Sequence, residues 1–520
     1  MTGRVGALVA LATVAVVGGN VSCGGDIKDD ATPTVEPPDP GAMPGSTPGG
    51  QPGGDATTPG PAQPGGDTAM PPEPGDDVMP GDDTTTPGDD GSAGDGADDM
   101  PTGPVGPIPN PDDPIEQRLR VTDVTIDEGV DGGGSTWGVW GRDDLRVARV
   151  FTAPLADCGM LVCTTTASGG QLTPQVFRLD AADQLVETIS FTPGLHCRGL
   201  AAEPDGHFAV LLWDDDGDRI YLERYDLEGQ QSWSTELTNE SNTPDSFNIG
   251  ESRVDYGDGR YGAYYHVHSD DGHEGDTLKW VTASDGTEDT GWSWGCSHSM
   301  SNLLRFNPAL TEFMSACVTD CFPGTNGDFS SNSIGGIYVN RREKVIDVDA
   351  GCNGDAAGEL GSAALAPGGW KLVFNAHQAP AGLGQGSYDS GDKNQDIGFS
   401  AVGSDGSPGP VVWLTDTPAI DEEDSSIARW QPAGDDAEQY VMGWVEGPRY
   451  VLARVDGSGT LLEGPIDVAA TAQWGRRDDP FRQGPNSDVL WTWFEQEGST
   501  TLKVARLSAG TGAEGCGTLP

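Results

Sequence analysis

The chain of 520 residues carries 82 acidic side chains against 28 basic ones, a formal net charge of −54. A surface this acidic repels phosphate backbones and anionic lipid headgroups, so nucleic acid is not expected as a ligand. Glycine and proline are abundant, with 77 and 39 residues, which predicts that part of the chain has no packed core.

The first segment has the features of an export signal. Arg4 is followed by an apolar run, Val5 to Val17, which is shorter than the roughly 20 residues that span a bilayer. Cys23 comes a few residues later, an order typical of a signal peptide with an attachment cysteine. Ser22 fits the motif that precedes a bacterial lipidation cysteine, whereas Asn20 departs from it.

We therefore expect residues 1–23 to be a signal peptide and Cys23 to carry a lipid. The lipid would anchor the protein to a membrane of the bacterial cell envelope, as an outer-membrane or cell-surface lipoprotein. Simple secretion is the alternative, because the residues around Cys23 match the lipidation motif only in part.

Residues 24–115 are predicted to be a disordered linker. They repeat proline, glycine, aspartate and threonine, and Lys28 is their single basic residue. Such a segment buries too little apolar surface to offset the entropy of ordering it. We expect a flexible tether between the anchor and a folded domain spanning 116–520.

Eight cysteines remain after Cys23, an even number that predicts disulfides in an exported chain. Their spacings do not match the paired C-x2-C units of structural zinc sites. We expect disulfides among Cys158, Cys163, Cys197, Cys296, Cys317, Cys321, Cys352 and Cys516, with Cys516 joining the C-terminus to an earlier strand.

One hairpin pattern recurs through the folded domain. Its clearest copy is 207–229, in which two strands rich in aliphatic and aromatic residues flank an acidic turn. Alternation of side chains within these strands indicates β-structure. Further copies lie at 160–183, 260–286, 313–349, 370–406, 439–459 and 488–510.

The copies end at positions 46 to 64 residues apart, a spacing that suits one four-stranded unit each. The closing positions are Asp180, Asp226, Asp285, Asp349, Asp405, Asp456 and Ser508. The pattern predicts an all-β fold, a β-propeller with seven blades, with six or eight as alternatives. A pair of β-sandwiches is the alternative architecture.

A further hairpin at 135–151 precedes the first copy, and too few residues separate the two for a complete extra blade. We therefore expect residues 118–151 to belong to an incomplete or ring-closing blade.

Asp226, Gly229 and Trp233 form a D-x-x-G-x3-W pattern. The chain resembles exported bacterial β-propeller lipoproteins of uncharacterised function, and this pattern resembles the repeat of quinoprotein-like propellers. The resemblance implies that a tryptophan stacks between blades, and it implies no activity.

Three histidines lie close together, at His266, His268 and His273. Two of them are separated by one residue and would share a face of a strand, so they are candidate zinc or copper ligands, with Glu274 or Asp276. The alternative is a polar strand face beside an exposed turn. Acidic turns such as 214–218 and 392–396 resemble calcium loops, but they lack the glycine that an EF-type loop requires.

The sequence contains no convincing catalytic set and no cofactor-binding motif. We therefore expect a tethered or secreted binding module that presents its propeller surface to a protein or glycan. Trp292, Trp294, Trp474 and Trp493 are candidate exposed aromatics for stacking on sugars. An extracellular glycoside hydrolase or lyase, and a structural envelope lipoprotein without a small ligand, are the alternatives.

Overall fold

The computed structural model describes most of the chain from residue 113 onward. The described residues are 113–520 except 132–149, 215–218, 238–246, 270–273, 297–298, 323–333, 341–342, 348–357, 377, 379–394, 476–478, 512–515 and 517–520. The predicted signal peptide, Cys23 and nearly all of the predicted linker therefore lie outside the described residues. One short helix, α1 (Ile115–Arg118), precedes the strands, and no described helix is long and apolar enough to cross a membrane.

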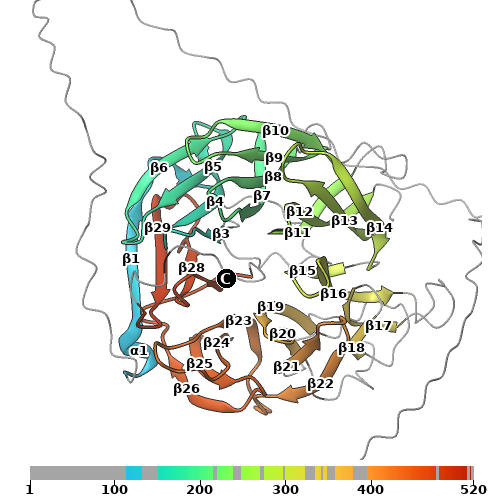
Figure 1. Cartoon of the computed structure of the whole chain (residues 1–520). Coiled ribbons are helices and arrows are strands. Elements are labelled where there is room, and N and C mark those ends of the chain that lie inside the picture. Colours follow the sequence, from blue (N-terminus) through green and yellow to red (C-terminus); the bar gives the residue numbers. More distant parts are fainter. Residues whose placement is uncertain are drawn as a thin grey trace, which may run out of the picture. The chain divides into compact units, whose positions relative to one another are not determined.

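The described strands form seven antiparallel sheets around a common centre (Figure 1), so the fold is a seven-bladed β-propeller. Six blades are built from consecutive strands, numbered here from the inside of the ring outward. Blade 1 contains β3 (Phe151–Pro154), β4 (Met160–Ser168), β5 (Gln171–Leu179) and β6 (Leu185–Ser190). Blade 2 contains β7 (Leu195–Ala202), β8 (Phe208–Asp214), β9 (Arg219–Tyr225) and β10 (Gln231–Glu236). Blade 3 contains β11 (Phe247–Gly257), β12 (Arg260–Ser269), β13 (Glu274–Thr282) and β14 (Glu288–Gly295).

The remaining consecutive blades follow the same order. Blade 4 contains β15 (Ser299–Asn307), β16 (Glu312–Phe322), β17 (Ile334–Val339) and β18 (Glu343–Asp347). Blade 5 contains β19 (Gly358–Ala366), β20 (Gly369–Ala376), β21 (Asp396–Gly403) and β22 (Pro408–Trp413). Blade 6 contains β23 (Glu422–Arg429), β24 (Gln439–Glu446), β25 (Arg449–Asp456) and β26 (Leu461–Asp467).

Blade 7 closes the ring with strands from the N-terminal and the C-terminal ends of the folded domain. Its first three strands are β27 (Arg482–Gln483), β28 (Val489–Trp493) and β29 (Thr501–Leu507), and its outer strand is β1 (Leu119–Thr125). β1 pairs with β29 from Leu119↔Leu507 to Thr125↔Thr501. The predicted ring-closing role of the 118–151 segment is thus confirmed for its first strand.

The rest of that segment contributes little to the described sheets. β2 (Gly129–Val130) pairs with the far end of β4, and β3 begins only at Phe151. The hairpin predicted at 135–151 falls almost entirely outside the described residues.

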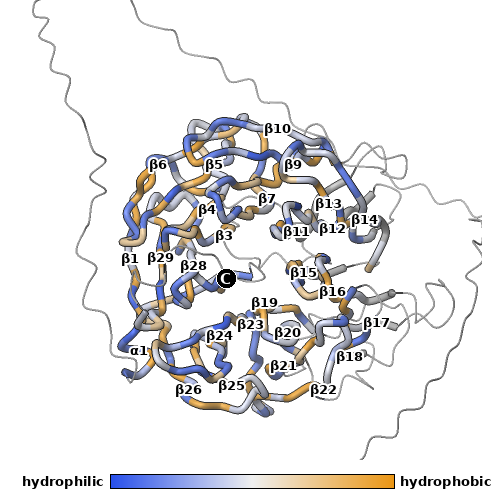
Figure 2. The backbone as a smooth tube through the Cα atoms, viewed as in Figure 1, coloured by the Kyte–Doolittle hydropathy of each residue, from blue (hydrophilic) through white to orange (hydrophobic). Residues whose placement is uncertain are grey.

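Six of the seven predicted hairpins are the second and third strands of a blade, and the copy at 313–349 contains the fourth strand, β18, as well. The copy at 207–229 contains β8 and β9, and the copy at 488–510 contains β28 and β29. The alternating apolar and polar stretches of these strands are visible around the ring in Figure 2.

The apolar cores of the described chain lie between neighbouring blades. The cluster of Leu211, Trp213 and Tyr261, for example, joins blades 2 and 3, and an equivalent cluster occupies each of the other six junctions. A single twisted sheet cannot bury both of its faces alone, so each blade depends on its neighbours for burial. The smallest of these clusters joins blades 3 and 4, around Tyr264, Leu278, Leu304 and Phe313.

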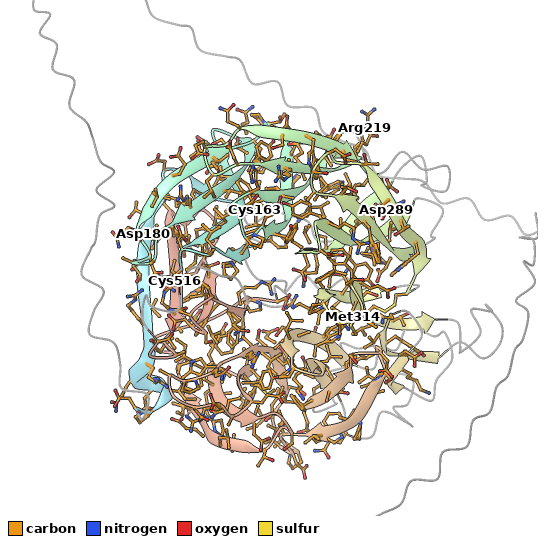
Figure 3. The ribbon with its side chains drawn as sticks, viewed as in Figure 1. Cys163, Asp180, Arg219, Asp289, Met314 and Cys516 are labelled. Carbon is orange, nitrogen blue, oxygen red and sulfur yellow. A yellow bond between two sulfur atoms is a disulfide. The ribbon has the colours of Figure 1, made fainter. Side chains whose placement is uncertain are left out.

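The aspartates that close the predicted copies shape the outer turns. Asp180, at the outer rim of the ring (Figure 3), accepts hydrogen bonds from the backbone N–H groups of Ala182 and Gln184, both at 2.8 Å. Asp226 and Asp456 make the same pair of contacts in their turns. A carboxylate that accepts from the backbone two residues on stabilises a tight turn, which explains why aspartate recurs there.

The D-x-x-G-x3-W pattern places its tryptophan between two blades, as the resemblance implied, but by edge-on packing and not by stacking. Asp226 forms the turn, Gly229 has φ of 77°, and Trp233 reaches the next blade. The indole Nε1 of Trp233 donates to the carbonyl of Ala283 at 2.8 Å, and its ring packs edge-on against Tyr261.

Three disulfides are present in the described residues, and each joins two neighbouring blades. Cys163–Cys197 links blades 1 and 2, Cys296–Cys317 links blades 3 and 4, and Cys158–Cys516 ties the C-terminal segment to blade 1. The predicted disulfide between Cys516 and an earlier part of the chain is confirmed, but its partner Cys158 lies in the turn between β3 and β4 and not in a strand. Cys352 and the side chain of Cys321 lie outside the described residues.

Candidate functional site

The innermost strands of all seven blades surround a central cavity of about 410 Å³. The lining includes Pro204, Asp258 and Pro308, which lie in turns between first and second strands. The cavity therefore occupies the end of the channel where the first strands finish. Each first strand contributes to the lining, among others through Thr152, Leu200, Asp255, Arg305, Ala363, Arg429 and Arg482.

Arg305 reaches from blade 4 across the ring. Its Nε donates to the carbonyl of Ala363 in β19 at 2.8 Å, and its Nη2 donates to Oδ1 of Asp479 at 2.6 Å. Asp479 directly precedes blade 7, which is three blades from blade 4 in one direction around the ring and four in the other. Such a contact is made near the axis, so this ion pair bridges opposite sides of the channel.

Asp479 is shared between two guanidinium groups. Nη1 of Arg482 donates to its Oδ2 at 2.8 Å, and Nε of Arg482 donates to the carbonyl of Thr152 at 3.1 Å. Burial opposes ionisation of Asp479, but Arg305 and Arg482 outweigh it and hold the pKa of this carboxyl below its ordinary value. Burial and the charge of Arg305 also lower the pKa of Arg482.

Asp255 is the second acidic residue of this region. Its carboxylate accepts from the backbone N–H groups of Phe306 at 2.6 Å and of Tyr256 at 2.9 Å. Burial raises the pKa of Asp255, while Arg305 and the two N–H groups oppose the rise.

A different acidic cluster lies at the junction of blades 5 and 6, where the first strands begin. Glu422, which is fully buried, accepts hydrogen bonds from Thr415 and, at 3.0 Å, from Thr417. Glu446 is its direct partner across β23 and β24. Burial raises the pKa of Glu422 to about 7, although the hydrogen bonds from the two threonine hydroxyls lower it. The charges of Glu446 and Asp396 add to the rise.

Several long connections between strands start and finish at strand ends on this second end of the ring. Residues 377–395 lie between β20 and β21, residues 348–357 between β18 and β19, and residues 468–481 between β26 and β27. In antiparallel blades the first strand begins where the second ends, so the strand ends that these connections join lie at one face. At the opposite face the connections are short, as at 258–259 and 367–368.

The candidate metal ligands are only partly described. His266 and His268 both lie in β12, as expected, but the side chain of His268 and all of His273 lie outside the described residues. His266 is buried, and its Nδ1 lies 3.0 Å from Oδ1 of Asp276, its partner across the sheet. Asp276 also lies near the sulfurs of Cys296 and Cys317, but these are bonded to each other and so offer no thiolate. A zinc, copper or calcium site stays a prediction.

The prediction of exposed tryptophans is wrong for two of the four. Trp474 and Trp493 are 2% and 6% exposed, because they fill the junction of blades 6 and 7. Trp292 is half-buried against Tyr264, and the side chain of Trp294 lies outside the described residues. The sequence patterns did not identify Asp255, Arg305, Asp479 and Arg482 as candidate site residues. The only signal that could have indicated them was their position as charged residues shortly before a predicted hairpin.

No protein-family model matches the chain, and no curated protein matches it. Similar solved structures include the α-L-arabinanase of Penicillium chrysogenum complexed with arabinobiose, at 10% identity and a TM-score of 0.39, covering 75% of this chain and 99% of that one. The aldose sugar dehydrogenase of Escherichia coli has 12% identity and a TM-score of 0.35, covering 74% and 99%. The quinohemoprotein alcohol dehydrogenase of Comamonas testosteroni has 10% identity and a TM-score of 0.35, covering 76% and 77%.

Similarity at this level says nothing about activity. The chain belongs to the seven-bladed β-propellers by the arrangement of its own sheets.

Proposed function

We propose that this protein is a binding module, tethered at the bacterial envelope through Cys23, that holds a glycan or protein ligand in its central cavity. The observation that carries the proposal is the cavity itself. Its volume of about 410 Å³ falls within the range of ligand-binding pockets, and all seven first strands contribute to it.

The composition of the lining supports ligand binding. Charged groups such as Asp255 and Arg305 lie beside apolar ones such as Phe306 and Val254. A mostly apolar wall with a few fixed polar groups is the usual character of a specific site, because the wall supplies affinity and the polar groups set orientation.

Binding of the full-length chain to a glycan array and to envelope proteins tests this proposal. The variant Gln483→Trp places an indole in the cavity, since Gln483 lines it from β27. We expect this variant to bind at least tenfold more weakly than the wild type. Its matched control is Glu187→Trp, on the exposed outer strand β6, which should bind as the wild type does.

If the protein bound neither any glycan of the array nor any envelope protein, the result would contradict the proposal and favour a structural envelope protein. Equal binding by wild type and Gln483→Trp, with both variants folded, would place the ligand elsewhere on the ring.

A glycoside hydrolase is the second candidate, and Glu422 is the observation that favours it. A carboxyl with a pKa of about 7 can act as a general acid at neutral pH, and Glu446 supplies a neighbouring carboxylate. A broad screen of glycoside substrates tests this reading. Hydrolysis that is lost in Glu422→Gln but kept in Gln483→Trp would support it, and no hydrolysis by the wild type would exclude it.

A further inference from the structure

The cavity of this acidic protein is surrounded by arginines. Arg305, Arg429 and Arg482 line it, and Arg253 lies close enough to influence Asp479. Asp255 and Asp258 also line the cavity and Asp479 lies beside it, so the four arginines outnumber the three carboxylates by one. Because the whole chain has a net charge of −54, a local surplus of guanidinium groups distinguishes the cavity from the rest of the molecule.

Arg482 has donor capacity that the described contacts do not use. Its Nε and Nη1 donate to Thr152 and Asp479, while its Nη2 makes no hydrogen bond among the described residues. The side chain is 20% exposed and lines the cavity. A guanidinium with a free edge beside a cavity is suited to receive a carboxylate.

The ion pair between Arg305 and Asp479 crosses the channel beside Arg482. A ligand that enters from the end where the first strands finish would therefore meet this pair at the inner limit of its path. This arrangement favours the terminal group of a chain over a polymer that passes through the ring.

The radial geometry favours a sugar over an extended peptide. The inner edges of seven strands converge on the cavity, and each presents backbone N–H and C=O groups at a different angle. A peptide in β-conformation pairs with one strand edge at a time. The hydroxyl groups of a sugar donate and accept in many directions, so they fit such a ring of edges better.

We infer that the cavity binds the terminal acidic sugar of a glycan, with its carboxylate on Arg482 and Arg305. This inference rests on the proposed binding function and specifies its ligand class. Asp479 competes with the ligand for the same two guanidinium groups and so limits the affinity for anions.

The experiment compares methyl β-D-glucuronide with methyl β-D-glucoside, which differ at the carboxylate. Binding of each to the full-length chain is measured by calorimetry at low salt. We expect the glucuronide to bind at least tenfold more tightly. In Arg482→Gln this preference should vanish, in Arg482→Lys it should persist in part, and in Asp479→Asn it should increase several-fold.

Arg449→Gln is the matched control, because it removes one positive charge at the surface, where Arg449 is 45% exposed. It should leave the preference unchanged. Thermal unfolding establishes which variants are folded, and the lysine variant keeps the test decisive if Arg482→Gln does not fold. Acetate and N-acetylglutamate serve as probes for a bare anion and for an acidic peptide.

Equal binding of glucuronide and glucoside, blocked by Gln483→Trp, would overturn the acidic-sugar inference and leave the binding function standing. Tighter binding of N-acetylglutamate than of the glucuronide would overturn it in favour of a peptide ligand. Binding of neither sugar in a protein that binds another glycan through the cavity would overturn it as well.

Discussion

Arg506 of β29 donates from Nη2 to Oδ1 of Asp183 at 2.8 Å, although 323 positions separate the two residues in the chain. Asp183 lies in the turn between β5 and β6 of blade 1, is fully buried, and also accepts from Arg120 of β1. One carboxylate thus joins the first strand of the folded domain, its last strand and the neighbouring blade.

Removing this carboxylate is expected to weaken the closure of the ring. Asp183→Ala leaves Arg506, with 7% of its side chain exposed, only the more distant carboxylate of Asp488 at 3.7 Å. Because breaking a buried pair on one side costs about 3–5 kcal/mol, we expect a loss toward the lower end of that range. Urea unfolding measures the loss. The control Asp123→Ala removes a surface partner of Lys503; Asp123 is 60% exposed, so its loss should cost under about 1 kcal/mol. Similar losses for the two variants would show that Asp183 does not hold the ring closed.

The disulfide Cys158–Cys516 should stabilise the fold more than Cys163–Cys197 does. Cys158–Cys516 joins residues that are 358 positions apart, whereas Cys163–Cys197 joins residues that are 34 positions apart. A longer closed loop removes more entropy from the unfolded chain, a difference of about 2 kcal/mol for these lengths. Replacing each pair by serine and measuring the free energy of unfolding tests this. A larger loss for the Cys163/Cys197 double variant would mean that native contacts, and not loop closure, set the order.

The buried carboxyl of Glu422 predicts a distinctive pH dependence of stability. Its folded-state pKa of about 7 lies above the ordinary value of 4.5, so the folded protein binds more protons between these two values. The contribution of Glu422 to the free energy of unfolding therefore falls as pH rises from about 4.5 to 7, by at most about 3 kcal/mol.

Comparing unfolding curves of wild type and Glu422→Gln across this range isolates the effect. The glutamine variant should lose that part of the slope, because it has no proton to release. Glu187→Gln, on an exposed strand, should keep the wild-type slope. An unchanged slope in Glu422→Gln would show that this carboxyl titrates at its ordinary pKa.

The repeating part of the fold was predictable because its signal is local. In 207–229, alternating side chains and the turn aspartate Asp226 lie within one hairpin, and an aspartate closes six of the seven copies in the sequence. The first strands were harder to find. β27 has only two residues, and β15 has the sequence SMSNLLRFN, which does not alternate cleanly.

The candidate site could not be predicted because its contacts are long-range. Arg305 and Asp479 are 174 positions apart and come from blades that do not touch. Only closure of the ring brings them together, and no spacing rule in the sequence records that. For the same reason Trp474 looked available for ligands, whereas the structure packs it against Phe481 and Trp491 between two blades.

The contact between Trp233 and the next blade gives a test of how closely the blades must dock. Gly286 has φ of 73°, and a Cβ added there would lie 2.7 Å from the indole ring of Trp233. Gly259 has φ of 72°, but a Cβ there would meet nothing within 4 Å. The two glycines therefore differ in packing while sharing the same backbone conformation.

Gly259→Ala should lose about 1 kcal/mol, because alanine disfavours positive φ. Gly286→Ala should lose a further 1–3 kcal/mol or so, because the indole is held by its hydrogen bond to Ala283 and cannot move aside freely. The free energy of unfolding of the two variants gives the difference directly. Equal losses would mean that the junction between blades 2 and 3 adjusts to an added methyl group, and that its docking tolerates a looser fit than the contacts of Trp233 indicate.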